Sequence, residues 1–407
     1  MTLVRSHIRS SIRGPLYGAT TGKYGRTGTI ADFTQDVDWT VPSVKGGPQS
    51  FSGSPGAGNL FRQGGNAVVC YAPNASGTLS AMSSTAFRRT NLGEWQYPSI
   101  NVRNLWNRDL TNAVWVATNG TATKNQTGAD GAANAASLIT ATSANATFLQ
   151  ATTNASANWV FQVDPRRVSG TGTLEMTMDG GTTWIVVTPA SSSFDVMNPK
   201  VINQSAVTNP SVGFRIATSG DSFAVDFTML FAQPTNYPAN TPIHSRPITT
   251  SATVQTFLER AYASFPDNSP LAIIARGPFA FYIQQRGYPN HPITSASNFQ
   301  VSVAPDGTIK FQNGASGQCV TAAGIWKTGL SQVNKIAGWC DGSTLKMAAN
   351  GSLAGAATGT IGLDPALDHW DLGTNGAGAN SIFGINERTA MGPNLTFTDA
   401  ELIAMTT

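Results

Sequence analysis

Carboxylates are the residues of this sequence most able to do acid–base chemistry, and they are sparse. The five glutamates are far apart along the chain: Glu94, Glu175, Glu259, Glu387 and Glu401. Retaining glycosidases need two carboxyl groups about 5 Å apart, one as acid and one as nucleophile. The nearest approach is Glu175 with Asp179, a spacing that puts both on one face of a strand but straddles a turn. We expect these two residues to form a polar edge, with a catalytic pair as the minor alternative.

The histidines and cysteines indicate no other reaction. No carboxylate or cysteine stands at metal-ligand spacing from any of the four histidines, which are His7, His244, His291 and His369. The three cysteines are expected to be free buried thiols, although the last two could lie close together in the fold: Cys70, Cys319 and Cys340. The sequence has no G-x-S-x-G nucleophile elbow and no phosphate-binding glycine loop. It therefore predicts no catalytic residue and a protein that is not an enzyme.

Tryptophans could serve binding, because a flat aromatic ring stacks on a sugar while Asn, Asp and Gln side chains bond its hydroxyls. The candidates for glycan binding are Trp106, Trp115 and Trp159, with Trp184 as a further one. A tryptophan within an apolar strand pattern is usually packed inside the protein. We therefore favour core packing for each of them and keep glycan binding as the alternative.

Calcium is the one cofactor that the residues leave open. A Ca²⁺ ion takes oxygen ligands from loop carboxylates and carbonyls. Four aspartates are of the required kind, although no spacing selects them: Asp221, Asp226, Asp364 and Asp368. No other cofactor is expected.

The composition indicates a β-rich protein that carries little charge. A chain of 407 residues should form about two to three domains. Apolar residues make up 41%, enough for packed cores, whereas charged residues make up 12%, roughly half the usual share. Thr, Ser, Asn and Gln must then supply the polar surface. The net charge of +3 is too small to indicate nucleic acid as a partner.

Hydropathy gives no sign of a membrane segment. No apolar run approaches the length of a membrane span or of a signal-peptide core, and the longest aliphatic patch is Leu271 to Ala275. We therefore expect the chain to be made and folded in a cytoplasm.

Residues 1–65 are expected to form an extended attachment arm. Basic residues precede the first acid, and Gly and Pro recur without helix or strand periodicity. Ordering such a segment costs entropy that an interface with a partner protein would recover. The residues expected to dock on that partner are Arg5, Arg9, Arg13, Tyr17 and Tyr24. A solvated flexible tail is the alternative, and nucleic acid is disfavoured because the charges are few and spread out.

Alternating apolar and polar residues predict a β-sandwich over 66–233, with a preamble at 66–103. The alternation recurs over 174–178, 212–216 and 223–227. In the last of these stretches, Phe223, Val225 and Phe227 should share one face. Hairpins with a single apolar face need a second sheet to cover them, so two packed sheets are expected.

A second sandwich is predicted over 253–407, after a proline-rich linker at 234–252. Apolar spacing at the start of this module favours a short helix over 253–265. Near the end, Thr398 and Glu401 have the spacing of a capping box, which predicts one short terminal helix.

Both modules carry a resemblance to known families. Residues 104–115, NLWNRDLTNAVW, are followed by residues 130–138, DGAANAASL, and this order resembles the jelly-roll, carbohydrate-binding-like module of tailed-phage fibre and spike proteins. The preamble stretch VVCYAPNASGTL looks like a diverged version of the one in that family. The turns Asp341–Gly342 and Asn350–Gly351, with the ending TDAEL, resemble the concanavalin A/laminin G type of sandwich. The expected fold class is mainly β, an extended N-terminal arm followed by two antiparallel β-sandwich domains, jelly-roll and concanavalin A-like.

The resemblance implies a structural virion protein of a tailed bacteriophage: a head spike or fibre, a decoration protein or a tail-fibre subunit. Its arm would bind other virion proteins of the capsid, collar or tail, and its modules would face a host cell-surface glycan. Such proteins commonly form homo-oligomers, with a trimer as one expectation, and the expected location is the virion, assembled in the cytoplasm of the bacterial host. The alternatives are a phage capsule or polysaccharide depolymerase and a bacterial glycan-binding adhesin.

Overall fold

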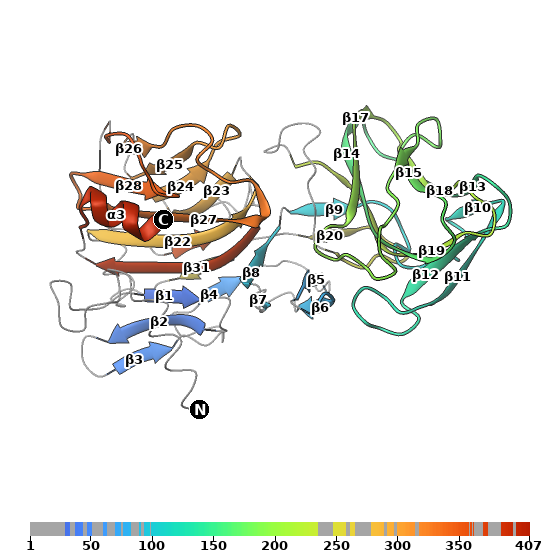
Figure 1. The fold of residues 1–407 in the computed structure, drawn as a ribbon, viewed down its shortest axis with the longest axis horizontal. Helices are drawn as coiled ribbons and strands as arrows, with labels where there is room; N and C mark the ends of the chain where they lie inside the picture. The colour runs from blue at the N-terminus through green and yellow to red at the C-terminus, as the bar shows by residue number, and fades with distance from the viewer. Residues whose placement is uncertain are drawn as a thin grey trace. The chain divides into compact units, whose positions relative to one another are not determined.

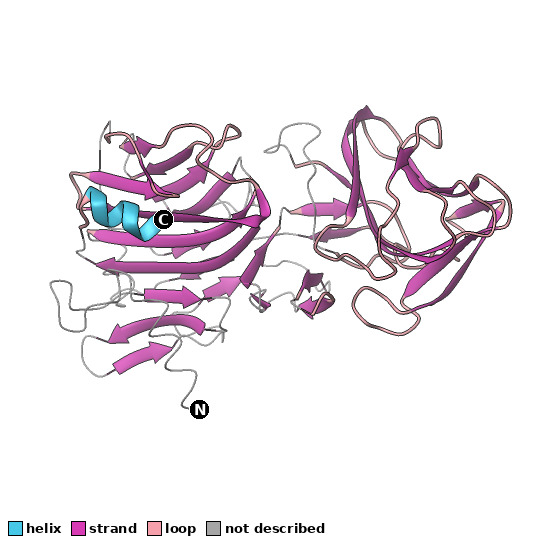
Figure 2. Cartoon of the chain, in the orientation of Figure 1, coloured by secondary structure: helices cyan, strands magenta, loops and turns pink. Residues whose placement is uncertain are grey.

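Strands dominate the structure (Figure 1). The computed structural model describes residues 29–32, 37–43, 47–50, 60–62, 70–74, 76–82, 89–90, 93–97, 99–234, 247–257, 261–264, 278–288, 291–296, 299–313, 317–357, 359, 361, 369–372, 384–393 and 396–407. Among these residues the one helix is α3 (Asp399–Thr406), drawn in cyan in Figure 2. The mainly β fold class predicted from the sequence is therefore confirmed, with antiparallel sheets in both halves of the chain.

The chain divides into two compact units. The central unit comprises Gly64–Ser84 and Tyr97–Leu258, and the composite unit comprises Met1–Gln63, Thr85–Gln96 and Glu259–Thr407. The division after Leu258 lies close to the module boundary expected at 253. Some described strands from the stretch expected to be an arm pair within the sheets of the composite unit.

Two sheets form the central unit. The described strands of the five-stranded sheet are, in order, β10 (Val116–Thr118), β13 (Ala146–Ala151), β18 (Ser211–Ile216), β15 (Leu174–Thr177) and β16 (Ile185–Val186). The seven-stranded sheet has β11 (Gly120–Gln126), β12 (Ala136–Ala141), β19 (Ser222–Ala232), β14 (Ala157–Ser169) and β17 (Lys200–Val207), with β9 (Ile100–Val102) on β19 and β20 (Gln255–Phe257) on β9. A separate hairpin joins β5 (Cys70–Pro73) to β6 (Leu79–Met82).

The inward side chains of these two sheets form one core. Alternation places Leu174, Met176, Phe148 and Phe214 in it from the five-stranded sheet, and all four are buried. Phe161 from β14 meets Phe214 with ring centroids 5.6 Å apart. The two sheets therefore pack as a sandwich, and its core is built from the residues whose period-2 spacing indicated it.

Strand β19 departs from the predicted alternation at Phe227. Phe223 and Val225 face the core between the sheets, whereas Phe227 belongs to a second buried cluster. The pairing register with β14 shifts next to Asp226, which gives β19 one extra residue, and Phe227 adopts a φ of 45°. The expectation that Phe227 shares the face of Val225 is wrong, because a β-bulge inverts the direction of the side chains that follow it.

Two buried asparagines fasten the loop before β10. Asn104 Nδ2 donates to the carbonyl oxygen of Thr228 on β19 at 2.8 Å. Asn107 Nδ2 donates to the carbonyl oxygen of Ile248 at 2.7 Å, and its Oδ1 accepts from the N–H of Thr250 at 2.8 Å. The described end of the segment expected to be a linker is thus held to the central unit by buried hydrogen bonds.

The composite unit also contains two sheets. Its larger sheet runs, among the described strands, through β29 (Ser352–Leu353), β28 (Leu345–Ala349), β27 (Gly329–Cys340), β22 (Phe279–Gly287), β31 (Gly384–Pro393), β1 (Thr29–Asp32), β2 (Val37–Ser43) and β3 (Gly47–Ser50), with β8 (Gly93–Gln96) on β31 and β7 (Arg89–Thr90) on β8. The second has β26 (Gln318–Val320), β25 (Ile309–Gln312), β24 (Phe299–Val303), β23 (His291–Ala296), β30 (His369–Leu372), β21 (Ala261–Ser264) and β4 (Leu60–Arg62). The rings of Phe281 on β22 and Phe311 on β25 meet edge to face, with their centroids 4.9 Å apart. The two sheets therefore pack as a sandwich.

The terminal helix is present where the sequence predicted it. Thr398 Oγ1 accepts from the N–H of Glu401, and the Glu401 carboxylate accepts from the N–H of Thr398, so both halves of the capping box form. The helix covers β27 and β28 through Leu402, which packs with Trp339 and Ala348.

The other expected helix, over 253–265, is wrong across its described residues. Gln255–Phe257 form β20, which pairs with β9, and Ala261–Ser264 form β21, which lies between β30 and β4. Pairing with strands far away in sequence overrides a short local helix pattern.

The core can be tested by a matched pair of substitutions on one sheet. Phe214→Ala should lower the free energy of unfolding by about 3–5 kcal/mol, because it removes a fully buried ring that contacts Phe161 and Trp115. Val116→Ala, at a side chain that is 63% exposed, should change it by less than about 0.5 kcal/mol. Urea denaturation measures both, and equal effects would contradict this description of the core.

Candidate functional site

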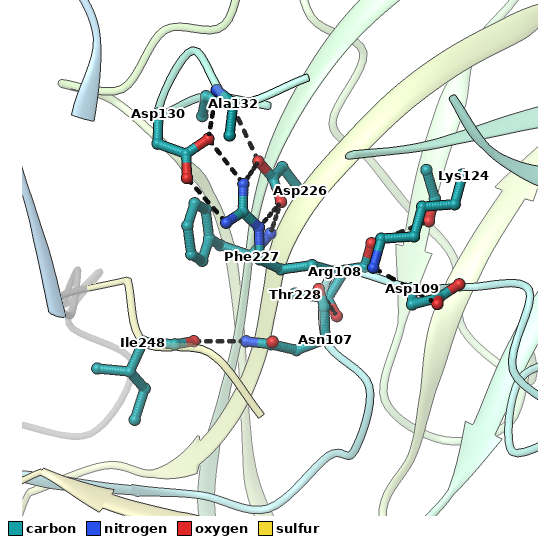
Figure 3. A network of polar contacts seen from close by, with 12 residues as sticks. Asn107, Arg108, Asp109, Lys124, Asp130, Ala132, Asp226, Phe227, Thr228 and Ile248 are labelled. Carbon is teal, nitrogen blue, oxygen red and sulfur yellow. Dashed lines mark hydrogen bonds and ion pairs between the residues drawn. The ribbon is translucent and has the colours of Figure 1, made fainter. Parts of the chain in front are cut away.

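Arg108 is a buried cation held by two aspartates of the central unit (Figure 3). Its Nε and Nη2 donate to the two carboxylate oxygens of Asp226 at 2.7 and 2.9 Å. Its Nη1 and Nη2 donate to Asp130, each at 2.8 Å. The guanidinium carbon lies 4.0 Å from the centroid of the Phe227 ring. One side chain thus links the loop before β10, the turn after β11 and the bulge of β19.

Burial and ion pairing shift the pKa values of Arg108, Asp130 and Asp226 in opposite directions. Burial raises the pKa of Asp226, although the hydrogen bonds and charge of Arg108 act against it. Burial alone would raise the pKa of Asp130 as well, but there Arg108 prevails and lowers it. Burial alone would lower the pKa of Arg108, and the two carboxylates reverse this and raise it. Arg108 is therefore a permanent positive charge with a structural role.

These contacts bear on the expected calcium ligands. Asp226 is bonded to Arg108, and Asp221 accepts from the N–H of Gly172 at 2.5 Å. The other two aspartates lie outside the described residues: Asp364 and Asp368. Within the part of the chain that the structure describes, no three His, Cys, Asp or Glu side chains are grouped to hold a metal ion. Calcium stays an expectation with no site assigned to it.

The two carboxylates weighed as a catalytic pair have other partners. Glu175 accepts from Arg215 Nε on the neighbouring strand. Asp179 accepts from Thr177 Oγ1 at 2.8 Å and from the N–H of Thr183 at 2.9 Å, which fixes the turn after β15. Partial burial alone would raise the pKa of Asp179, but the hydrogen bonds from Thr183 and Thr177 lower it. One carboxylate therefore serves a cross-strand ion pair and the other a turn.

The outer face of the five-stranded sheet gathers a continuous row of side chains. The strand register sets its members side by side in the order Thr118, Thr147, Arg215, Glu175 and Val186. The neighbours of Thr147, Arg215 and Glu175 along their strands lie in the core, so the row points away from it. We call Glu175, Trp184, Val186 and Arg215 the Trp184 surface.

The Trp184 ring is half-buried and is held in place on this surface. Arg215 Cζ lies 4.7 Å from its ring centroid, and Arg215 is itself paired with Glu175. The turn before Trp184 contains Gly181 at a φ of 96°, where a Cβ would come within 2.9 Å of the indole. This position needs glycine both for its left-handed backbone and for the close approach of the ring. Contacts within the protein therefore hold the indole of Trp184 in one orientation.

An open hollow of about 370 Å³ adjoins this surface. It lies between β16, at the edge of the five-stranded sheet, and β17, at the edge of the seven-stranded sheet. It is lined by β16 with the two residues after it and by Pro199 to Val201 at the start of β17. Ile185 and Val186 are 44% and 59% exposed. Exposed apolar groups beside an aromatic ring, a guanidinium and a carboxylate are the mixture that sugar recognition needs.

The three tryptophans singled out as glycan-binding candidates lie in or against the core. Trp115 and Trp159 are 4% and 3% exposed, and their Nε1 atoms donate to the carbonyl oxygens of Leu105 and Val207 at 3.2 and 3.0 Å. Trp106 is half-buried, packs against the same core cluster and has a φ of 50°. Core packing, the interpretation that the sequence favoured, describes all three positions, and the two buried rings present no face to a sugar.

Three other expectations from the sequence concern the docking residues, the cysteines and membrane segments. The residues expected to dock on a partner lie outside the described residues: Arg5, Arg9, Arg13, Tyr17 and Tyr24. The three cysteines, all among the described residues, are buried and form no disulfide: Cys70, Cys319 and Cys340. Among the residues that the structure describes, no helix has the length and apolar character to cross a membrane.

Sequence reasoning missed Arg108 and Arg215. Arg215 stands between two core residues of an alternating strand, which already places it on the outer face. Its position opposite Glu175, however, depends on a pairing between strands about forty residues apart, and a local pattern does not contain that register. Arg108 lies in a loop, where no periodicity indicates burial.

Comparisons with known proteins give structural likenesses alone. No known family matches the chain, and no curated protein matches it. Among solved structures, the CBM40 domain of the Ruminococcus gnavus IT-sialidase, bound to α2,3-sialyllactose, is 18% identical. The match covers 34% of this chain and 86% of that one, with a TM-score of 0.28.

Two longer matches have lower scores. The tandem CBM22 domain of Paenibacillus barcinonensis Xyn10C is 10% identical over 76% of this chain and 96% of that one, with a TM-score of 0.23. The tail fiber protein gp63.1 of a phage of E. coli is 9% identical over 72% of this chain and 42% of that one, with a TM-score of 0.19. Likenesses of this size carry no argument about what the chain binds.

Asp164 is a second buried carboxylate near the Arg108 cluster. It is 2% exposed, and its Oδ2 has no hydrogen-bond partner among the described residues. Burial raises its pKa well above the ordinary value, and the negative charges of Asp226 and Asp195 add to the shift while Arg108 opposes it. A carboxylate in such a place opposes folding whenever it must ionise.

Asp164→Asn should therefore raise the free energy of unfolding at pH 7. The folded pKa lies above the unfolded value of about 3.9, so wild-type stability is lost as pH rises from that value to the folded pKa. The gain in the variant should vanish as pH falls to about 4. Denaturation at a series of pH values measures this, and a pH-independent gain would contradict it.

Asp306→Asn is the contrasting variant. Hydrogen bonds from Thr308 lower the pKa of Asp306, so this carboxylate contributes stability above its unfolded pKa, and that contribution is lost as pH falls through the folded value. Its replacement should reduce stability at pH 7, the opposite sign to Asp164→Asn.

Proposed function

We propose that this protein is a glycan-binding adhesion protein and that the Trp184 surface is its binding site. The observation that carries the proposal is the indole of Trp184 held against Arg215, which is paired with Glu175 on an outward-facing sheet. A fixed indole can stack on the C–H face of a sugar, while the guanidinium and the carboxylate bond its hydroxyls. Val186 and the adjoining hollow extend the apolar contact to a second sugar residue.

In this proposal the protein binds glycan without cleaving it. A depolymerase would need two converging carboxylates, and the nearest such residues, Glu175 and Asp179, are engaged by Arg215 and by the turn after β15. A bacterial adhesin would use the same binding chemistry and would differ in where the protein resides.

We further propose that the chain is a virion protein of a tailed bacteriophage, a head spike, fibre, decoration or tail-fibre subunit. The resemblance of residues 104–115 and 130–138 to the module of such proteins supports this, as does a chain of β-sandwich units with 12% charged residues. Those of the first 65 residues that precede β1, such as Arg5, Arg9 and Arg13, would attach the chain to other virion proteins. A homo-oligomer, a trimer for example, would present several copies of the surface together.

A glycan array probed with the full chain tests the binding proposal. The wild type should bind a defined subset of glycans, and Trp184→Ala should lower that binding at least about fivefold, since stacking on one aromatic ring is worth about 1–3 kcal/mol. Arg166→Ala is the control, because Arg166, on β14 of the seven-stranded sheet, makes a similar contact with the ring of Phe194 in the loop before β17. The control should bind like the wild type. Equal binding by all three proteins would place the site elsewhere.

Mass spectrometry of purified phage particles tests the virion proposal. Peptides of this chain should remain with the particles through density-gradient purification, in a constant ratio to the capsid protein. Their loss into the soluble fraction would reject a virion role and would leave the glycan-binding proposal to the array.

A further inference from the structure

A second hollow lies in the composite unit, at the edge of β28 beside α3. Its volume is about 410 Å³, which falls in the range of roughly 300–1,000 Å³ that small-molecule sites occupy. It is lined by residues 343–347, residues 353–357, Ile361 and Asp399. The hollow therefore combines a strand edge, the segment that follows β29 and the first turn of α3.

The backbone of β28 is open toward this hollow. Strand β29 pairs with the last two residues of β28, and the N–H of Ala354 donates to the carbonyl oxygen of Met347 at 2.9 Å. Bonded pairs alternate along an antiparallel ladder, and the N–H of Asp341 closes one by donating to the carbonyl oxygen of Thr344. The N–H and C=O of the next residue, Leu345, must then point away from β27 and toward the hollow.

The side chains divide the hollow into a charged mouth and an apolar floor. Lys346 Nζ lies 2.6 Å from Asp399 Oδ1, and these two side chains are 41% and 48% exposed. An ion pair this exposed adds little to stability, so a ligand can share its donor and acceptor at small cost. Leu345 and Met347 are buried at the floor, while Leu353 is 38% exposed.

We propose that this hollow is a second carbohydrate subsite that takes one neutral sugar residue. It goes beyond the proposed function, since it lies in the other unit and shares no residue with the Trp184 surface. Two vicinal hydroxyls need a donor and an acceptor side by side, and Lys346 with Asp399 provide them. The outward N–H and C=O of Leu345 provide a second such pair. Leu353, which is 38% exposed, contacts the C–H groups of the ring above the buried floor of Leu345 and Met347.

The geometry favours a small neutral ligand over two other kinds. The mouth carries one charge of each sign, so it gives no net attraction to an anionic or a cationic ligand. An added peptide strand would need several consecutive open residues along the edge. Here the contact of Ala354 with Met347 closes the strand one step beyond the open Leu345.

Methyl NMR of the full chain labelled at its methionines tests the proposal at the site itself. The probes are D-glucose, D-galactose and N-acetyl-D-glucosamine, each titrated alone. At least one of them should shift the Met347 methyl signal in a saturable way. Met176 and Met178, buried in the core of the central unit, report on that unit in the same spectrum.

Two variants separate this subsite from the Trp184 surface. Ala356→Trp fills the hollow from an exposed position of its lining and should abolish the Met347 shift, whereas Trp184→Ala should leave it unchanged. Lys346→Met should weaken the apparent affinity at least fivefold. Lys335→Met is its matched control, because Lys335, on β27 of the same sheet, donates to the carbonyl oxygen of Thr407 after α3 and does not line the hollow.

Each outcome of these titrations either supports the proposed subsite or overturns it. A saturable Met347 shift that is lost in Ala356→Trp and kept in Trp184→Ala supports the subsite, even if the glycan array gives nothing. The absence of any Met347 shift with all three sugars overturns it, as does a shift that persists in Ala356→Trp or disappears in Trp184→Ala.

Discussion

The bulge of β19 at Asp226 is the constraint on which the central unit depends. Strand β19 is buried on both faces, so its side chains must satisfy a core on one side and the Arg108 cluster on the other. Alternation after Val225 sets Asp226 against Arg108, and the extra residue turns Phe227 out of the core to the same side. A buried carboxylate without a counter-ion is very costly, so the bulge and the arginine must form together. The positive φ of Phe227 is tolerated because the guanidinium and Tyr71 cover its ring.

This arrangement separates the groups that stabilise the unit from those available for binding. Several residues singled out in the sequence are engaged inside: Asp226 with Arg108, and Trp115 and Trp159 with backbone carbonyls. The outer face of the five-stranded sheet takes no part in these buried contacts. Changes at Trp184 or Val186 leave the core contacts untouched, so the specificity of this face can vary while the fold stays the same.

The sequence predicted those parts of the fold that depend on local period and turns. Alternation around Phe214 placed the core correctly, and the Thr398–Glu401 spacing predicted the terminal helix. It could not predict the bulge, because a register shift depends on the partner strand β14 and leaves no mark in the local pattern. For the same reason the stretch at 253–265 suggested a helix although long-range partners make it two strands. At the candidate site, Glu175 and Trp184 were visible as residue types, whereas Arg215 gains its role from pairing alone.

The shape of both candidate subsites bears on how such a protein would bind. Each is shallow and open, with one preformed aromatic ring or one exposed ion pair, and a site of this kind binds a single sugar residue weakly. Weak sites become effective when several act at once, since the second contact on the same glycan surface is intramolecular. If the two subsites bind as proposed, the low charge of the chain matters too, because crowded copies would not repel one another strongly. Adhesion would then depend on the number of surfaces displayed and less on the affinity of any one.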